Sequence, residues 1–77
     1  MSAHIEHLPP MSDELYRARM ETFGSMVTVY ANDNGEIGLT VSGLDLKREQ
    51  LALMNRDDVA ALRYMLTAAL EAQGVTA

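Results

Sequence analysis

The stretch VYANDNGEIGLTV, residues 29–41, predicts a β-hairpin whose turn contains Asn34-Gly35. Apolar and polar residues alternate on both sides of that turn, which is typical of strands with one buried face. A two-residue loop would place Asp33 opposite Glu36. That register sets two like charges face to face and divides the apolar residues between both faces of the sheet.

A three-residue loop, Asp33-Asn34-Gly35, gives a register with the apolar residues together. The pairs would be Asn32 with Glu36, Ala31 with Ile37, Val29 with Leu39 and Val27 with Val41. A loop of this length commonly combines a type I turn with a final residue in the left-handed region, which glycine enters without steric cost. We prefer this register, and it assigns the acidic and amide residues of the loop to turn geometry.

The segment that begins at Ser12 predicts a short N-terminal helix. Ser12 is a suitable N-cap, and Tyr16, Met20 and Phe23 recur at helical spacing before Gly24. We expect this helix to precede the hairpin.

The segment LDLKREQLALM, residues 44–54, fits either a strand or a helix. Leu44/Leu46 and Leu51/Leu53 match as two short strands around a polar KREQ turn, with Leu46 opposite Leu51. The residues between them are also good helix formers. We favour a third strand, with a two-stranded hairpin plus an extra helix as the alternative.

A long C-terminal amphipathic helix over about residues 56–73 is the clearest element. Asn55 is a suitable N-cap and Gly74 a suitable stop. Its apolar positions cover an arc of roughly 200°, more than one sheet needs. The surplus edge consists of Ala61, Met65, Ala68 and Ala72. We expect the helix to pack on the sheet and this edge to contact a second subunit or the first helix.

These elements predict an α+β fold with an antiparallel three-stranded meander between the two helices. Residues 1–11 contain Pro9-Pro10 and no sustained period, so we expect a flexible N-terminal arm followed by one small domain over residues 12–77. A chain of 77 residues buries only roughly 60% of the surface that its unfolded state exposes. The core should therefore be thin.

Charge and composition narrow the classes of function. The chain has 11 acidic and 6 basic residues, a net charge of −5 and no cysteine. This balance disfavours long-range attraction to phosphate backbones, and disulfides and thiolate metal cages are excluded. The N-terminus has no signal-peptide pattern, and no apolar run is long enough to span a bilayer. We therefore predict a cytoplasmic protein without membrane contact.

The residue types of catalytic and metal sites occur, but in patterns with simpler explanations. The HIEH stretch, residues 4–7, has no third nitrogen or sulfur ligand elsewhere, so a solvated tail is the better interpretation. Asp33 and Glu36 belong to a turn, and Asp57 and Asp58 suit the positive end of a helix. We therefore predict that the chain is not an enzyme and has no cofactor or metal.

The prediction for function is a small acidic protein-binding module that acts as an inhibitor or regulator through protein–protein contacts. Tyr30, Asp33, Glu36 and Arg48 are the candidate partner-binding residues, because loops on a rigid scaffold commonly present recognition groups. Ala61, Met65, Ala68 and Ala72 are the candidate homodimer contact. The N-terminal arm carries apolar residues that we expect to order on a partner.

In size, acidity and α+β pattern the chain resembles the small phage-encoded inhibitors of bacterial defence, such as anti-CRISPR proteins. The resemblance implies inhibition of another protein by direct contact, and it assigns no role to any residue because no motif carries it. The alternative is a small dimeric nucleic-acid-binding or transcription-regulating domain. In that case Tyr30 would stack on a base and Lys47-Arg48 would meet a phosphate.

Overall fold

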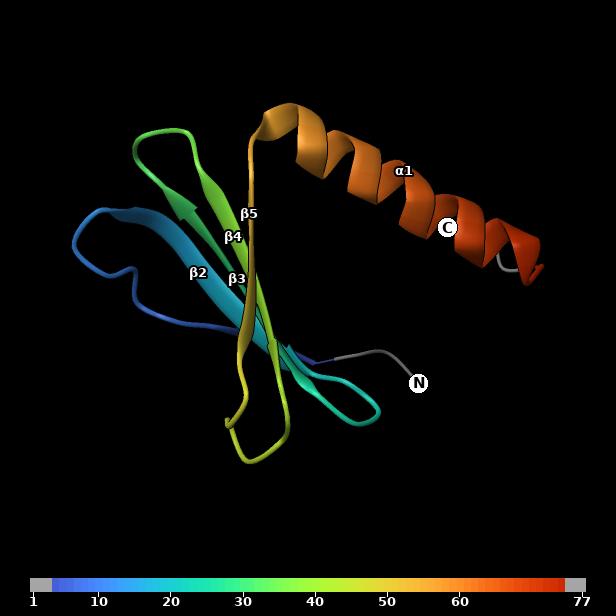
Figure 1. Ribbon diagram of the computed structural model, residues 1–77, viewed down its shortest axis with the longest axis horizontal. Coiled ribbons are helices and arrows are strands. Elements are labelled where there is room, and N and C mark those ends of the chain that lie inside the picture. The colour runs from blue at the N-terminus through green and yellow to red at the C-terminus, as the bar shows by residue number, and fades with distance from the viewer. Residues whose placement is uncertain (1–3, 75–77) are drawn as a thin grey trace.

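One antiparallel sheet and a single helix form the regular structure of residues 4–74, the part of the chain that the computed structural model describes. In chain order the elements are β1 (Ile5–His7), β2 (Glu14–Glu21), β3 (Met26–Asn32), β4 (Ile37–Ser42), β5 (Gln50–Met54) and α1 (Arg56–Ala72). Each strand pairs with the next along the chain, so the sheet is a five-stranded meander (Figure 1). The α+β class and the antiparallel meander are confirmed, but the sheet has five strands and not the predicted three.

The hairpin of β3 and β4 forms in the preferred register. Val29 lies opposite Leu39, and the backbone N–H of Asn32 donates to the carbonyl of Glu36 at 2.8 Å. Gly35 has a φ of 93°, the left-handed conformation that the bulged turn requires. The three-residue loop is therefore confirmed.

The predicted N-terminal helix is wrong, because the segment after Ser12 forms strand β2. Tyr16, Ala18 and Met20 alternate with charged residues along this strand, and β2 pairs with the whole length of β3. A separation of four residues places Tyr16 and Met20 on one side of a helix and equally on one side of a strand. Pairing with β3 decides between the two, and it leaves Ala18 only 5% exposed.

The short strand β1 forms one edge of the sheet, with Ile5 opposite Met20. It belongs to residues 1–11, for which the sequence predicts a flexible arm. Residues 1–3 lie outside the described residues. The division into an arm and a domain stays a prediction.

The predicted third strand exists as β5 and continues the meander, but its register differs from the expected one. Leu51 lies opposite Thr40 of β4 and not opposite Leu46. Residues 43–49 form a loop in which Leu46 and Arg48 have left-handed φ angles of 63° and 57°. Pairing with β4 is favoured because it forms more backbone hydrogen bonds than a local hairpin between residues 44–46 and 51–53 would. The alternative helix over this segment is wrong.

The register gives the sheet two different faces, because successive side chains of a strand point to opposite sides. We call one the apolar face, and it carries Ile5, His7, Tyr16, Ala18, Met20, Val27, Val29, Ala31, Ile37, Leu39, Val41, Gln50, Ala52 and Met54. The other is the polar face, which carries Glu6, Arg17, Arg19, Glu21, Met26, Thr28, Tyr30, Gly38, Thr40 and Ser42, with Leu51 and Leu53 toward β5.

Helix α1 begins at the predicted residue but does not lie on its own sheet. A capping box fixes its start: Asn55 Oδ1 accepts from the Asp58 N–H at 2.8 Å, and Asp58 Oδ2 accepts from the Asn55 N–H at 3.1 Å. The helix contacts the sheet at β5 and then projects away from it (Figure 1). Val59 and Leu62 are half-buried, and no residue of the helix is fully buried. The expected packing along the sheet is absent from the single chain.

The core of the single chain is correspondingly thin. Ala18 is the one buried hydrophobic residue among residues 4–74, and Thr40 and Ser42 are buried on the polar face. The radius of gyration is 13.5 Å, whereas a compact domain of this length has about 11.5 Å. Most of the apolar side chains therefore remain accessible to solvent.

Gly38 provides a test of the packing on the polar face. A Cβ at this position would overlap the ring of Tyr30, which lies directly across from it on β3. We expect Gly38→Ala to destabilise the fold by about 1 kcal/mol, because the ring must move away. In a Tyr30→Ala background the same change should stabilise by about 0.5–1 kcal/mol, since alanine suits a strand better than glycine does. Urea unfolding of the four proteins measures both effects. An equal effect of Gly38→Ala in the two backgrounds would contradict the packing described.

Candidate binding surfaces

The four predicted partner-binding residues do not form one patch. Asp33 and Glu36 lie in the β3–β4 loop at one end of the sheet, whereas Arg48 lies in the loop after β4, at the opposite end (Figure 1). Tyr30 lies within β3, on the polar face. The structure therefore brings together only the two carboxylates of the turn, and their role in binding stays a prediction.

The ring of Tyr30 already has two neighbours within the sheet. It packs against Gly38 across the strand pair, and the guanidinium carbon of Arg17 lies 5.0 Å from its centroid. This is the distance of a cation–π contact. A base would have to displace Arg17 before it could stack on this ring.

The two arginines of the polar face are each paired with a carboxylate. Arg17 donates to both carboxylate oxygens of Glu14, at 2.8 and 2.6 Å. Arg19 Nε donates to Glu6 Oε1 at 2.8 Å, across β1 and β2. A bidentate arginine–carboxylate pair is stronger than a single-point contact. The pairs neutralise the positive charge that this face would otherwise offer to a phosphate.

The loop between β3 and β4 is held by its own polar groups. Asn34 Nδ2 donates to Glu36 Oε1 at 2.9 Å, and Asn34 Oδ1 accepts from the Glu36 N–H at 3.0 Å. The N–H of Asp33 donates to the carbonyl of Asp13 at 2.9 Å, which ties this loop to the one before β2. Within residues 4–74, no group of three or more histidine, cysteine or acidic side chains is arranged to hold a metal ion.

The first apolar surface comprises the apolar face and the underside of α1. A shallow hollow of about 220 Å³ opens on this face between β1, β2 and β3, lined chiefly by Ile5, Tyr16, Met20, Val27 and Val29. On the helix, Leu66 and Met65 are each 59% exposed. The predicted dimer contact lies on α1 beside Leu66. It consists of Ala61, Met65, Ala68 and Ala72, and all four are exposed.

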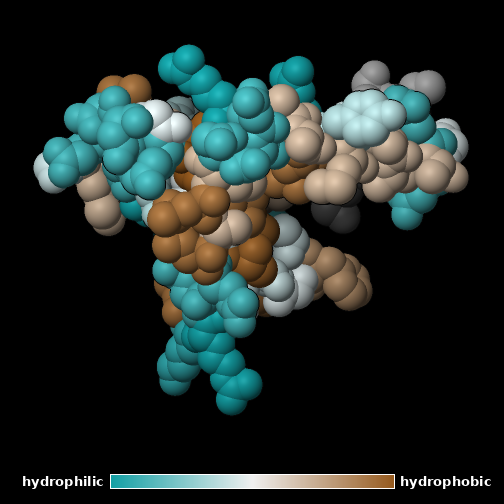
Figure 2. All heavy atoms as spheres, turned by 45° about the horizontal axis from the view of Figure 1, so that its top comes forward, coloured by the Kyte–Doolittle hydropathy of each residue, from teal (hydrophilic) through white to brown (hydrophobic). Residues whose placement is uncertain are grey.

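The second apolar surface is the free edge of the sheet at β5. Leu51 and Leu53 are 54% and 55% exposed, and Leu44 and Leu46 in the preceding loop are also exposed. Hydrophobic atoms gather at the surface in the middle of the molecule (Figure 2). As the last strand of the sheet, β5 has backbone N–H and C=O groups along its outer side that are not paired with another strand of the sheet.

Neither this edge nor the exposed ring of Phe23 is among the residues predicted from the sequence to bind a partner. Phe23 is predicted there as part of a helix, whereas it lies in the turn between β2 and β3 with its side chain fully in solvent. The alternation of charged and apolar residues from Arg17 to Met20 was the signal for a strand. A strand based on this alternation ends before Phe23 and places that residue in a turn.

The pair of Glu14 and Arg17 predicts a pH dependence of stability. The Arg17 guanidinium, and next the Met11 N–H, hold the pKa of Glu14 at about 2, below its ordinary 4.5. A carboxyl whose pKa is lower in the folded state stabilises the fold above its unfolded pKa, and this contribution is lost as the pH falls. We expect stability to decline between about pH 4.5 and pH 2, and Glu14→Gln to remove that part of the decline. Urea unfolding at stepped pH measures it, and an unchanged profile for the variant would refute the assignment.

Comparison with known proteins finds no family model that matches the chain, and no matching curated protein or solved structure. Over residues 4–74 no helix is long and apolar enough to cross a membrane.

Proposed function

We propose that the chain is a small acidic, non-enzymatic protein-binding module that acts as an inhibitor or regulator through protein–protein contacts. The observation that carries this proposal is the apolar, uncharged edge strand β5, of sequence QLALM. Sheets usually protect such an edge with lysine, proline or a bulge, because an open edge pairs readily with another chain. β5 has neither of these residues.

The partner that fits this edge is an extended segment of another protein, added as a sixth strand. In this mode of recognition, main-chain hydrogen bonds supply affinity and alternate side chains supply specificity. Leu51 and Leu53 point to one face, where they offer an apolar strip for the side chains of the added strand. The preceding loop adds two more exposed leucines, Leu44 and Leu46, close to β5 in the sequence.

The polar face supports a structural role better than a catalytic one. Its most perturbed group, Glu14, is held as a carboxylate by Arg17, and Arg17 in turn covers Tyr30. Every member of this constellation already has a partner within the chain. A group that acts as a general acid or base instead needs a pKa near the working pH.

A substitution on β5 tests the proposal. We expect Leu53→Lys to abolish capture of the partner, because it places a charge in the apolar strip and protects the edge. The matched control is Leu15→Lys, since Leu15 is 70% exposed on β2 and lies away from the β5 edge. The measurement is affinity capture from host lysate, with and without nuclease, followed by mass spectrometry.

Three results would count against the proposal: the absence of any captured protein, equal capture by the two variants, or capture that disappears on nuclease treatment. The last result would favour the nucleic-acid-binding alternative. Slower exchange of the β5 amide hydrogens in the captured complex would support the added strand directly.

A further inference from the structure

The single chain exposes far more surface than a protein of its mass normally does. Its accessible area is 6244 Å², whereas a folded monomer of 8.5 kDa has about 4,700 Å². The excess is about 1,500 Å² for each chain, so two chains that covered it together would bury about 3,000 Å². Obligate homodimers typically bury about 2,000–5,000 Å².

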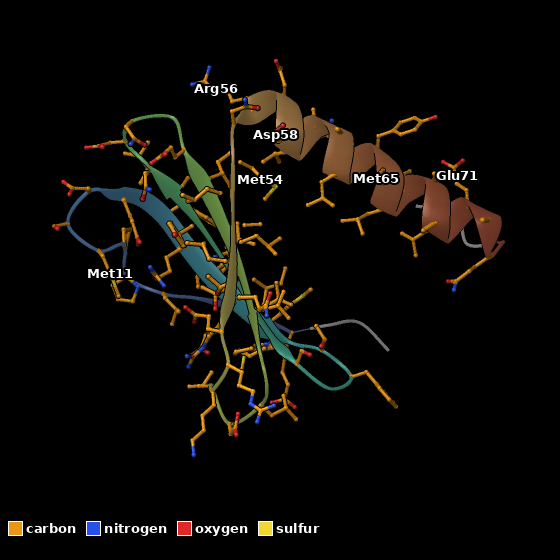
Figure 3. The ribbon with its side chains drawn as sticks, in the orientation of Figure 1. Met11, Met54, Arg56, Asp58, Met65 and Glu71 are labelled. Carbon is orange, nitrogen blue, oxygen red and sulfur yellow. The ribbon has the colours of Figure 1, made fainter. Side chains whose placement is uncertain are left out.

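Two complementary apolar surfaces are open to solvent in the single chain. The apolar face of the sheet has no helix over it, and the underside of α1 has no sheet below its later turns. Figure 3 shows Met54 beside the first turn of the helix and Met65 farther along, away from the sheet. Beyond Leu62, the leucines of α1 are exposed, with Leu66 at 59% and Leu70 at 41%. These leucines do not pack on their own sheet.

The dimensions of the two surfaces also match. A helix of 17 residues is about 25 Å long. Five strands at the usual spacing make a sheet about 19 Å wide from the first to the last strand. The helix is therefore long enough to cross the whole apolar face of another chain. The hollow beside Met20 and Val29 is open to receive one of its leucine side chains.

We infer that a second copy of this chain covers the apolar face, with α1 of each protomer lying across the sheet of its partner. A reciprocal exchange of this kind places the same surface on both sides of a two-fold axis. In this arrangement the leucine side of α1 packs on the partner's sheet. The alanine edge that includes Ala61 and Ala68 then lies beside the partner's helix, where small side chains permit a close approach.

The charge distribution permits a second copy of the chain to bind at this site. Each chain carries a net charge of −5, so self-association requires a contact with little charge of its own. From Val59 to Ala72, the apolar arc of the helix contains no ionisable side chain. Arg56 and Glu71 project from the side of the helix away from the sheet (Figure 3). The contact can therefore form without opposing acidic groups.

The test is the mass of the full chain in solution, by sedimentation equilibrium at tens of micromolar. We expect twice the chain mass of 8.5 kDa. Leu66→Glu should raise the dimer dissociation constant at least about 100-fold, because it buries a carboxylate against the apolar face. The matched control, Tyr64→Glu, changes the charge equally and lies on the opposite side of the helix, where Tyr64 is 76% exposed. It should shift the constant by less than about threefold.

A second measurement locates the contact. In a dimer formed from isotope-labelled and unlabelled chains, we expect filtered nuclear Overhauser effects from the α1 leucine methyl groups of one chain to the Val29 and Met20 methyl groups of the other. A monomer at tens of micromolar would overturn the inference. So would a dimer joined through the two β5 edges, or one that Leu66→Glu leaves intact. These outcomes are separate from the function proposed above, which depends on Leu53 and the β5 edge.

Discussion

The reciprocal hydrogen bonds between Asn55 and Asp58 determine how the molecule is arranged. They fix the first turn of α1 one residue after β5 ends, so the chain has no linker in which to fold back. The helix must leave in the direction that the capped turn sets, and that direction carries it away from the sheet. For this reason the apolar face of the sheet and the leucine side of α1 remain apart within one chain. The thin core and the extended shape follow from that separation.

A chain of this kind gains stability from whatever covers its apolar surfaces. A ligand or subunit that binds only the folded state stabilises it in proportion to the logarithm of its concentration over its dissociation constant. Ala18 alone is a buried hydrophobic residue over residues 4–74, which is little for a chain without disulfides. For the dimer inferred above, folding and assembly would be one process, in which the covered sheet forms the core that the single chain lacks.

Sequence patterns predicted the local features well because local physics decides them. The loop of Asp33 to Gly35 follows from the need to keep like charges apart and apolar residues on one face, and the start of α1 follows from the cap at Asn55. The segment from Tyr16 to Phe23 was harder to predict, because the spacing of Tyr16 and Met20 fits both a helix and a strand, and only the short alternation from Arg17 to Met20 favours the strand. Pairing with β3 decides it, and that is a long-range contact.

The candidate sites were harder to predict for a related reason. Tyr30 and Arg48 look like recognition residues when their chemistry alone is considered. In the structure, Arg17 covers Tyr30, and Arg48 lies at the far end of the sheet from Asp33. A sequence shows which groups are present, but whether each is free for a partner depends on pairs such as Glu14–Arg17. The exposed edge at β5 is likewise defined only once the order of the strands is known.

The two proposed contacts are compatible, because they use different directions of the same sheet. A helix from a second copy approaches perpendicular to the sheet and covers the apolar face, whereas an added strand approaches in the plane of the sheet and pairs with β5. A dimer built in this way would carry two β5 edges, one from each chain. Once one edge has bound a target that carries two copies of the matching segment, the second edge meets its segment at a high effective concentration. A modest affinity at each edge then gives a strong overall attachment. Self-association through the apolar face would then serve the binding function, as well as completing the core.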